Sequence, residues 1–89
     1  MRKPNSVTIL GQLIDVEYVD DLIITEGIYG DACAVEYKIR LDASLDDEKF
    51  KHILRHEKMH IILRLSGLVE HLSPETEEAL CCLMEHATL

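Results

Sequence analysis

Two histidines four residues apart, His56 and His60, enclose Glu57 in the segment H-E-K-M-H, which has the H-E-x-x-H spacing. Residues four apart lie on one face of an α-helix, so both imidazoles can reach a single metal ion. A zinc ion held in this way needs a third protein ligand and keeps a fourth position for water. Glu57 would project nearby without ligating, where it could take a proton from that water. The segment therefore predicts a zinc site with Glu57 as the general base.

The third ligand is expected on the acidic segment that follows, where Glu77 and Glu78 lie 17 and 18 residues beyond His60. On a helical wheel Glu77 borders the apolar face of this segment, whereas Glu78 lies roughly opposite that face and is expected to be solvated. The wheel therefore favours Glu77 as the ligand, with Glu78 as the alternative. Cys81, one turn after Glu77, is a weaker candidate.

Other polar side chains have a chemical and a plainer interpretation. His52 lies one turn before His56 and either stabilises an oxyanion or faces water, and we favour water because nothing else distinguishes it. Tyr29 either donates a hydrogen bond to a tetrahedral intermediate or is a half-buried tyrosine at a strand end, which we favour. His71 and His86 are expected to be exposed.

The motif lies within a helix predicted over residues 45–66. Ser44 gives this helix a capping-box-like start, and Gly67 is suited to end it. The helix is apolar on more than one side, so we expect it to be packed between layers. A shorter helix is predicted from Pro74 to about residue 87, with Ser73 as its N-cap. Its apolar face is predicted to carry Leu80, Leu83, Met84 and Ala87.

The first half of the chain is strand-like. Alternating and β-branched apolar residues predict strands at residues 7–10, 13–19 and 34–41, and residues 22–25 are expected to continue a meander. Strands followed by two helices predict one α+β domain over residues 1–89. Its small, antiparallel-rich sheet precedes the long helix and the shorter C-terminal helix.

Composition restricts the class of protein. The chain has 89 residues, of which 47% are hydrophobic, and a formal net charge of −8. An acidic chain lacks the basic face that nucleic-acid binding requires, and no apolar run reaches the roughly 18–20 residues that cross a bilayer. The start of the chain has no signal-peptide pattern. Three cysteines, an odd number, indicate reduced thiols in the core, and the expected location is the cytoplasm.

The segment I-L-R-H-E-K-M-H-I-I-L-R-L-S-G-L, followed by E-E-A-L-C-C-L-M, resembles compact zincin-like metallopeptidases encoded by phages and prophages, related to the ImmA/IrrE group. The strands T-I-L-G-Q-L-I-D-V-E-Y-V-D-D and Y-K-I-R-L-D-A-S-L are similar to the short sheet of such proteins. This resemblance implies a gluzincin-like site in which His56, His60 and Glu77 bind zinc and Glu57 is the general base. It also implies the host cytoplasm and a protein or peptide substrate, such as a regulatory protein.

Two hypotheses follow for the function. The first is a zinc-dependent endopeptidase of phage or mobile-element type that binds its substrate by strand addition to an edge strand around residues 34–41. The alternative is a non-catalytic zinc-binding structural or interaction module of phage origin. Lys58, a charged residue inside the motif, and the short chain favour this alternative slightly. A metal-free acidic partner protein is a third interpretation.

Overall fold

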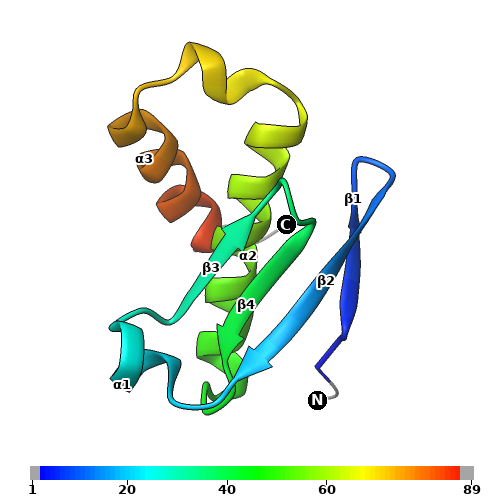
Figure 1. Cartoon of the computed structure of the whole chain (residues 1–89). Helices are drawn as coiled ribbons and strands as arrows, with labels where there is room; N and C mark the ends of the chain where they lie inside the picture. Colours follow the sequence, from blue (N-terminus) through cyan, green and yellow to red (C-terminus); the bar gives the residue numbers. More distant parts are fainter. Residues whose placement is uncertain (1–2, 87–89) are drawn as a thin grey trace.

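The computed structural model describes residues 3–86, which form a mixed four-stranded sheet with helices packed on it (Figure 1). The predicted α+β class is confirmed. The elements in chain order are β1 (Ser6–Ile9), β2 (Gln12–Val19), α1 (Leu22–Glu26), β3 (Gly30–Cys33), β4 (Lys38–Asp42), α2 (Asp47–Leu65), the 3-10 helix η1 (Leu68–His71) and α3 (Pro74–Glu85). No helix within residues 3–86 is both long enough and apolar enough to cross a membrane.

The strands of the sheet are ordered β1-β2-β4-β3. β1 and β2 are antiparallel, β2 and β4 are parallel, and β4 and β3 are antiparallel. Leu10 and Gly11 connect β1 to β2 as a two-residue loop, and both have positive φ values, of 50° and 80°. This backbone matches the twist of a tight hairpin. The bounds of both strands agree with the sequence prediction to within one residue at each end.

Three strand predictions are corrected by the structure. Residues 22–25 belong to helix α1 rather than to a strand, because the buried carboxylate of Asp42 accepts a hydrogen bond from the backbone N–H of Ile23 at 2.8 Å near the start of this helix. Residues 34–37 form a turn, so only the last part of the predicted strand 34–41 pairs in the sheet. β4 also lies between β2 and β3, and therefore cannot receive an added strand at an open edge.

Both main helices begin at side-chain caps. Asp46 caps α2 by accepting a hydrogen bond from the backbone N–H of Lys49 at 2.8 Å. Ser44, the predicted cap, instead donates its backbone N–H and its hydroxyl to Asp42. Ser73 caps α3 as predicted and accepts from the N–H of Thr76 at 3.1 Å. The predicted end of this helix at about residue 87 lies outside the described residues.

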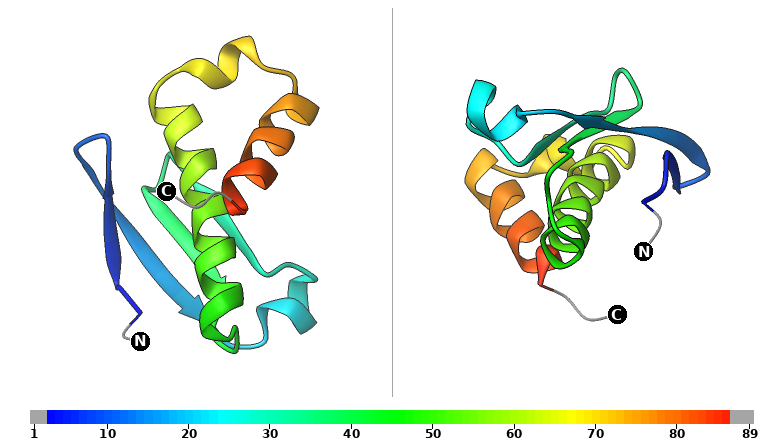
Figure 2. Two further views of the ribbon diagram at one scale, coloured as in Figure 1. Left: turned by 180° about the vertical axis from the view of Figure 1, so that it is seen from behind. Right: turned by 90° about the horizontal axis from the view of Figure 1, so that it is seen from below.

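The core lies between one face of the sheet and α2. The central strands β2 and β4 supply the buried apolar side chains Ile14, Val16, Ile39 and Leu41 to this layer. Helix α2 supplies the facing ones, Phe50, Ile53 and Ile61. Helices α2 and α3 lie on the same side of the sheet, with α3 packed against α2 (Figure 2). Helix α2 is therefore packed between the sheet and α3, as its apolar pattern predicted.

Gly30 allows β3 to approach both β4 and α2 closely. A Cβ atom at this position would lie 2.7 Å from the carbonyl oxygen of Arg40, 2.8 Å from Cδ2 of Leu41 and 3.2 Å from Cγ2 of Ile53. We expect Gly30→Ala to lower the free energy of unfolding by about 1–3 kcal/mol, the usual cost of overpacking, measured by urea denaturation. An unchanged midpoint would show that β3 can move away from α2 at little cost.

Candidate metal centre

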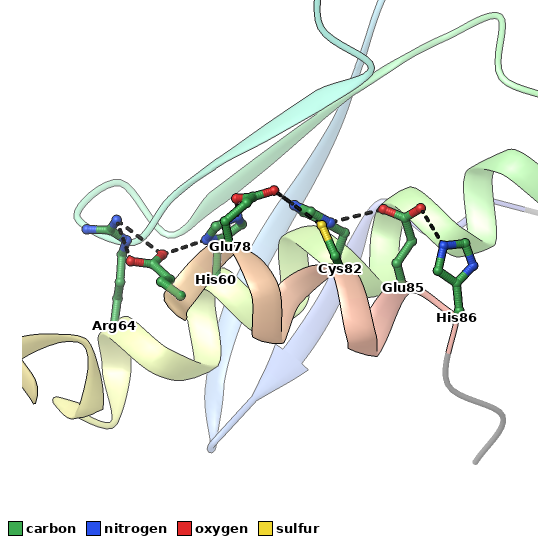
Figure 3. A network of polar contacts seen from close by, with 8 residues as sticks. His60, Arg64, Glu78, Cys82, Glu85 and His86 are labelled. Atoms are coloured by element: carbon green, nitrogen blue, oxygen red, sulfur yellow. Dashed lines mark hydrogen bonds and ion pairs between the residues drawn. The ribbon is translucent and has the colours of Figure 1, made fainter. Parts of the chain in front are cut away.

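His56 and His60 lie one turn apart on α2, and their rings share a carboxylate of the neighbouring helix. Nε2 of His56 is 2.9 Å from Oε1 of Glu78, and Nε2 of His60 is 3.2 Å from Oε2 of the same residue. Figure 3 shows Glu78 of α3 beside His60 of α2. One ligand atom from each of the three residues can be chosen so that all lie within 4.8 Å of one another. The three side chains therefore converge on one point between the helices.

The second nitrogen of each ring also faces a carboxylate of α3. Nδ1 of His60 is 2.6 Å from Oε2 of Glu77, and Nδ1 of His56 is 3.0 Å from Oε1 of Glu85. Glu77 in turn accepts hydrogen bonds from Nη2 of Arg64 at 3.3 and 3.4 Å. Each imidazole is thus held between two glutamates, one at each nitrogen.

The structure brings both glutamates considered as the third ligand to the histidines, but at different atoms. Glu77 contacts Nδ1 of His60 alone, whereas Glu78 contacts Nε2 of both rings. The wheel was right that Glu77 is buried and Glu78 largely exposed, with 8% and 55% of their side chains exposed. It could not show that the exposed flank of α3 faces the histidines, because that depends on how α3 packs against α2.

The buried face of α3 also differs from the prediction. Leu83 was placed on this face, yet it is 71% exposed. The buried residues of the helix are Glu77 and Cys81. Burial raises the pKa of the Cys81 thiol to about 12, with Glu78 and Glu77 adding to the rise, so this thiol stays protonated at neutral pH. The other two cysteines, Cys33 and Cys82, are exposed rather than in the core.

Glu57 lies beside the histidines and faces an open pocket of about 320 Å³. The residue is only 7% exposed, and burial raises the pKa of its carboxyl group, a rise that the neighbouring His56 and His60 oppose. The same pocket is lined by β3 through Gly30, Asp31 and Ala32, and by Arg64 and Glu78. The general-base role expected of Glu57 stays a prediction.

The remaining candidates lie around this centre rather than in it. His52 is 3.9 Å from a carboxylate oxygen of Glu48, and its ring packs edge-on against that of His86 at 5.4 Å between centroids. Tyr29 lines a second, adjacent pocket, and Nζ of Lys49 lies 4.4 Å from the centre of its ring. The pocket that Tyr29 lines is also lined by His56, Glu57 and Glu78, whereas His52 lines neither of these two pockets. The side chain of His52 is 34% exposed and contacts Glu48 and His86, so the interpretation that it faces water stays a prediction.

Comparison with known proteins gives one match. Residues 43–89 match the family model DA1-like, described as Protein DA1. The match includes α2, η1 and α3, and therefore all the histidines and glutamates of the candidate metal centre. No curated protein and no solved structure matches the chain.

This match corrects the family assignment made from the sequence. The resemblance to phage-encoded zincin-like metallopeptidases is wrong, and the assignments that it carried, a phage-type zinc endopeptidase or a zinc module of phage origin, are overturned with it. The physical reason is that H-E-x-x-H states only that two histidines share a helix face, which unrelated helices can also satisfy. The family model matches more than half of the residues, and the chain therefore belongs to the DA1-like family.

Proposed function

We propose that this DA1-like domain binds one zinc ion between α2 and α3. Its ligands would be Nε2 of His56, Nε2 of His60 and a carboxylate oxygen of Glu78. The observation that carries the proposal is the approach of both Nε2 atoms to one carboxylate, at 2.9 and 3.2 Å. Two imidazoles and a carboxylate are ligands that zinc accepts, and three protein ligands leave a fourth position open to solvent.

The dimensions of the site fit such an ion. Zinc binds imidazole nitrogen and carboxylate oxygen at about 2.0–2.2 Å in tetrahedral geometry, so two ligand atoms of one ion lie roughly 3.3–3.6 Å apart. One ligand atom from each of His56, His60 and Glu78 can be chosen so that all three lie within 4.8 Å of one another. Side-chain adjustments of about 1–1.5 Å in the separations of these atoms would therefore complete the coordination. Glu78 is largely exposed, which leaves its side chain room to adjust.

The charges around the rings also favour a cation. Four carboxylates lie at or beside the two imidazoles, those of Glu57, Glu77, Glu78 and Glu85. Arg64 supplies a positive charge to one of them, Glu77. A neutral imidazole has one N–H and can donate to only one of the two carboxylates that face it. A divalent ion at the Nε2 atoms supplies the missing positive charge and lets each Nδ1–H donate to its own glutamate.

Zinc content is the direct test. We expect protein purified without added metal, or reloaded after chelation, to contain about one zinc ion per chain by elemental analysis. His60→Ala should remove most of this zinc, because it deletes a ligand. His71→Ala is the matched control, since His71 lies in η1 and is exposed, and this variant should keep the full content. A wild-type chain that takes up no zinc, or a His60→Ala variant that retains it, would contradict the proposal.

A further inference from the structure

We infer that Glu77 and Glu85 are positioning residues, which hold the imidazoles of His60 and His56 so that both Nε2 atoms point to one ion. The inference rests on the proposed zinc site, and it gives a role to two carboxylates that do not bind the ion themselves. Both belong to α3, and each lies at the Nδ1 atom of a different histidine. A metal-binding histidine commonly donates its other N–H to a carboxylate, which fixes the tautomer and the orientation of the ring.

Glu77 is itself held in place. Its side chain is 8% exposed, and Oε2 lies 2.6 Å from Nδ1 of His60. Both carboxylate oxygens also accept from Nη2 of Arg64, one turn further along α2. A carboxylate fixed between two groups of α2 has little freedom to rotate towards the pocket. It therefore acts through His60 rather than on the ion directly.

Glu85 has the corresponding arrangement two turns later on α3. Its side chain is 19% exposed, Oε1 lies 3.0 Å from Nδ1 of His56, and Oε2 lies 3.4 Å from Nε2 of His86 (Figure 3). One oxygen thus orients the ring of the motif histidine, while the other lies near the exposed ring of His86, the residue that follows the helix.

Together the two pairs select one tautomer for each ring. Donation from Nδ1–H to Glu77 or Glu85 places the lone pair of each neutral imidazole on Nε2. These are the two atoms that converge on Glu78. Without the outer carboxylates the rings could rotate about their side-chain bonds or exchange tautomers, and the three ligand atoms would no longer be held together before the ion binds.

The test measures zinc affinity and the ring tautomer in the same variants. We expect Glu77→Ala and Glu85→Ala each to weaken zinc binding by about 10- to 100-fold in competition with a chromogenic chelator. In long-range ¹H–¹⁵N spectra of the zinc-loaded protein, the Nδ1–H signal of His60 should be lost or exchange rapidly in Glu77→Ala, and that of His56 in Glu85→Ala. Each variant should leave the signal of the other histidine unchanged.

Two controls separate positioning from general damage. Glu75→Ala removes a charge from an exposed residue in the first turn of α3, and it should leave the affinity within about twofold of the wild type. Glu77→Gln and Glu85→Gln keep the size of the side chain and a neutral acceptor oxygen, so they should restore most of the affinity even where an alanine variant loosens the helix.

The outcomes distinguish this inference from the proposed function. Wild-type protein that binds zinc, together with alanine variants that bind it equally well or keep both Nδ1–H signals, would overturn the positioning role alone. A loss of affinity in Glu75→Ala as large as in Glu85→Ala would overturn it too, because the effect would then be one of overall charge. Wild-type protein that binds no zinc would overturn the zinc site and the positioning role together.

Discussion

Glu78→Gln is expected to lower the zinc affinity by more than about 100-fold, whereas Glu77→Gln should lower it by no more than about 10-fold. The two residues are adjacent on α3, and each substitution removes one negative charge without changing the size of the side chain. The difference arises because Glu78 contacts the Nε2 atoms of both histidines, while Glu77 contacts Nδ1 of His60 and Arg64. Loss of a ligand exceeds the roughly 10- to 100-fold effect typical of an outer partner.

Chelator competition with the two variants side by side measures this difference. A cobalt-substituted sample adds a second readout, because the visible spectrum of Co²⁺ depends on its ligands and should change in Glu78→Gln and persist in Glu77→Gln. The reverse ranking, with Glu77→Gln the more damaging, would identify Glu77 as the third ligand. In that case the helical wheel would have been the better guide, and the observed contacts of Glu78 would not describe the bound state.

Zinc is expected to stabilise the domain by about 4 kcal/mol at a free concentration roughly 1,000 times its dissociation constant. For a domain of this size each kcal/mol raises the melting temperature by about 4–8 °C, so the rise should be on the order of 15 °C or more. This value follows from mass action, and the structure indicates where the ion would act: the buried residues of α3 are Glu77 and Cys81 rather than its leucines. An ion shared by His56, His60 and Glu78 would join α3 to a helix that the sheet already holds.

Hydrogen exchange can show where this stabilisation acts. We expect zinc to slow amide exchange mainly in α3 and to have less effect in β2 and β4, which are paired on both sides within the sheet. His56→Ala should remove both the rise in melting temperature and the protection of α3. If zinc slowed amide exchange equally in the sheet and in α3, the ion would not act mainly by attaching α3. A melting temperature that does not depend on zinc would contradict the stabilisation itself.

Much of the helical half could be predicted because its signals are local. Ser73 and Pro74 start α3, and Gly67, with a φ of 80°, follows the end of α2, all within a few residues of the boundaries they set. The four-residue spacing of His56 and His60 likewise places both rings on one face of α2, where the structure has them with centroids 5.1 Å apart. Such features depend on helix geometry alone and do not require a partner from elsewhere in the chain.

The sheet was harder to predict because its signals are not local. Residues 22–25 have the β-branched composition of a strand, but a hydrogen bond from Ile23 to Asp42, 19 residues away, accompanies a helix there. The same carboxylate accepts hydrogen bonds from Ser44, and α2 is capped by Asp46 in place of Ser44. β3 contains Gly30, which has no intrinsic preference for a strand. It is suited to this position because a residue without a Cβ atom lets β3 approach β4 and α2 closely.

The sequence by itself determined that two histidines and a nearby glutamate share one turn of a capped helix, and that an acidic helix follows. Only the tertiary structure decided which glutamates meet which nitrogens, with Glu78 between the two Nε2 atoms and Glu77 and Glu85 at the Nδ1 atoms. The physical reason is that a wheel orders residues around one helix by polarity. The pairing of side chains across two helices depends on their relative rotation and separation, which are set by packing against the sheet and against each other.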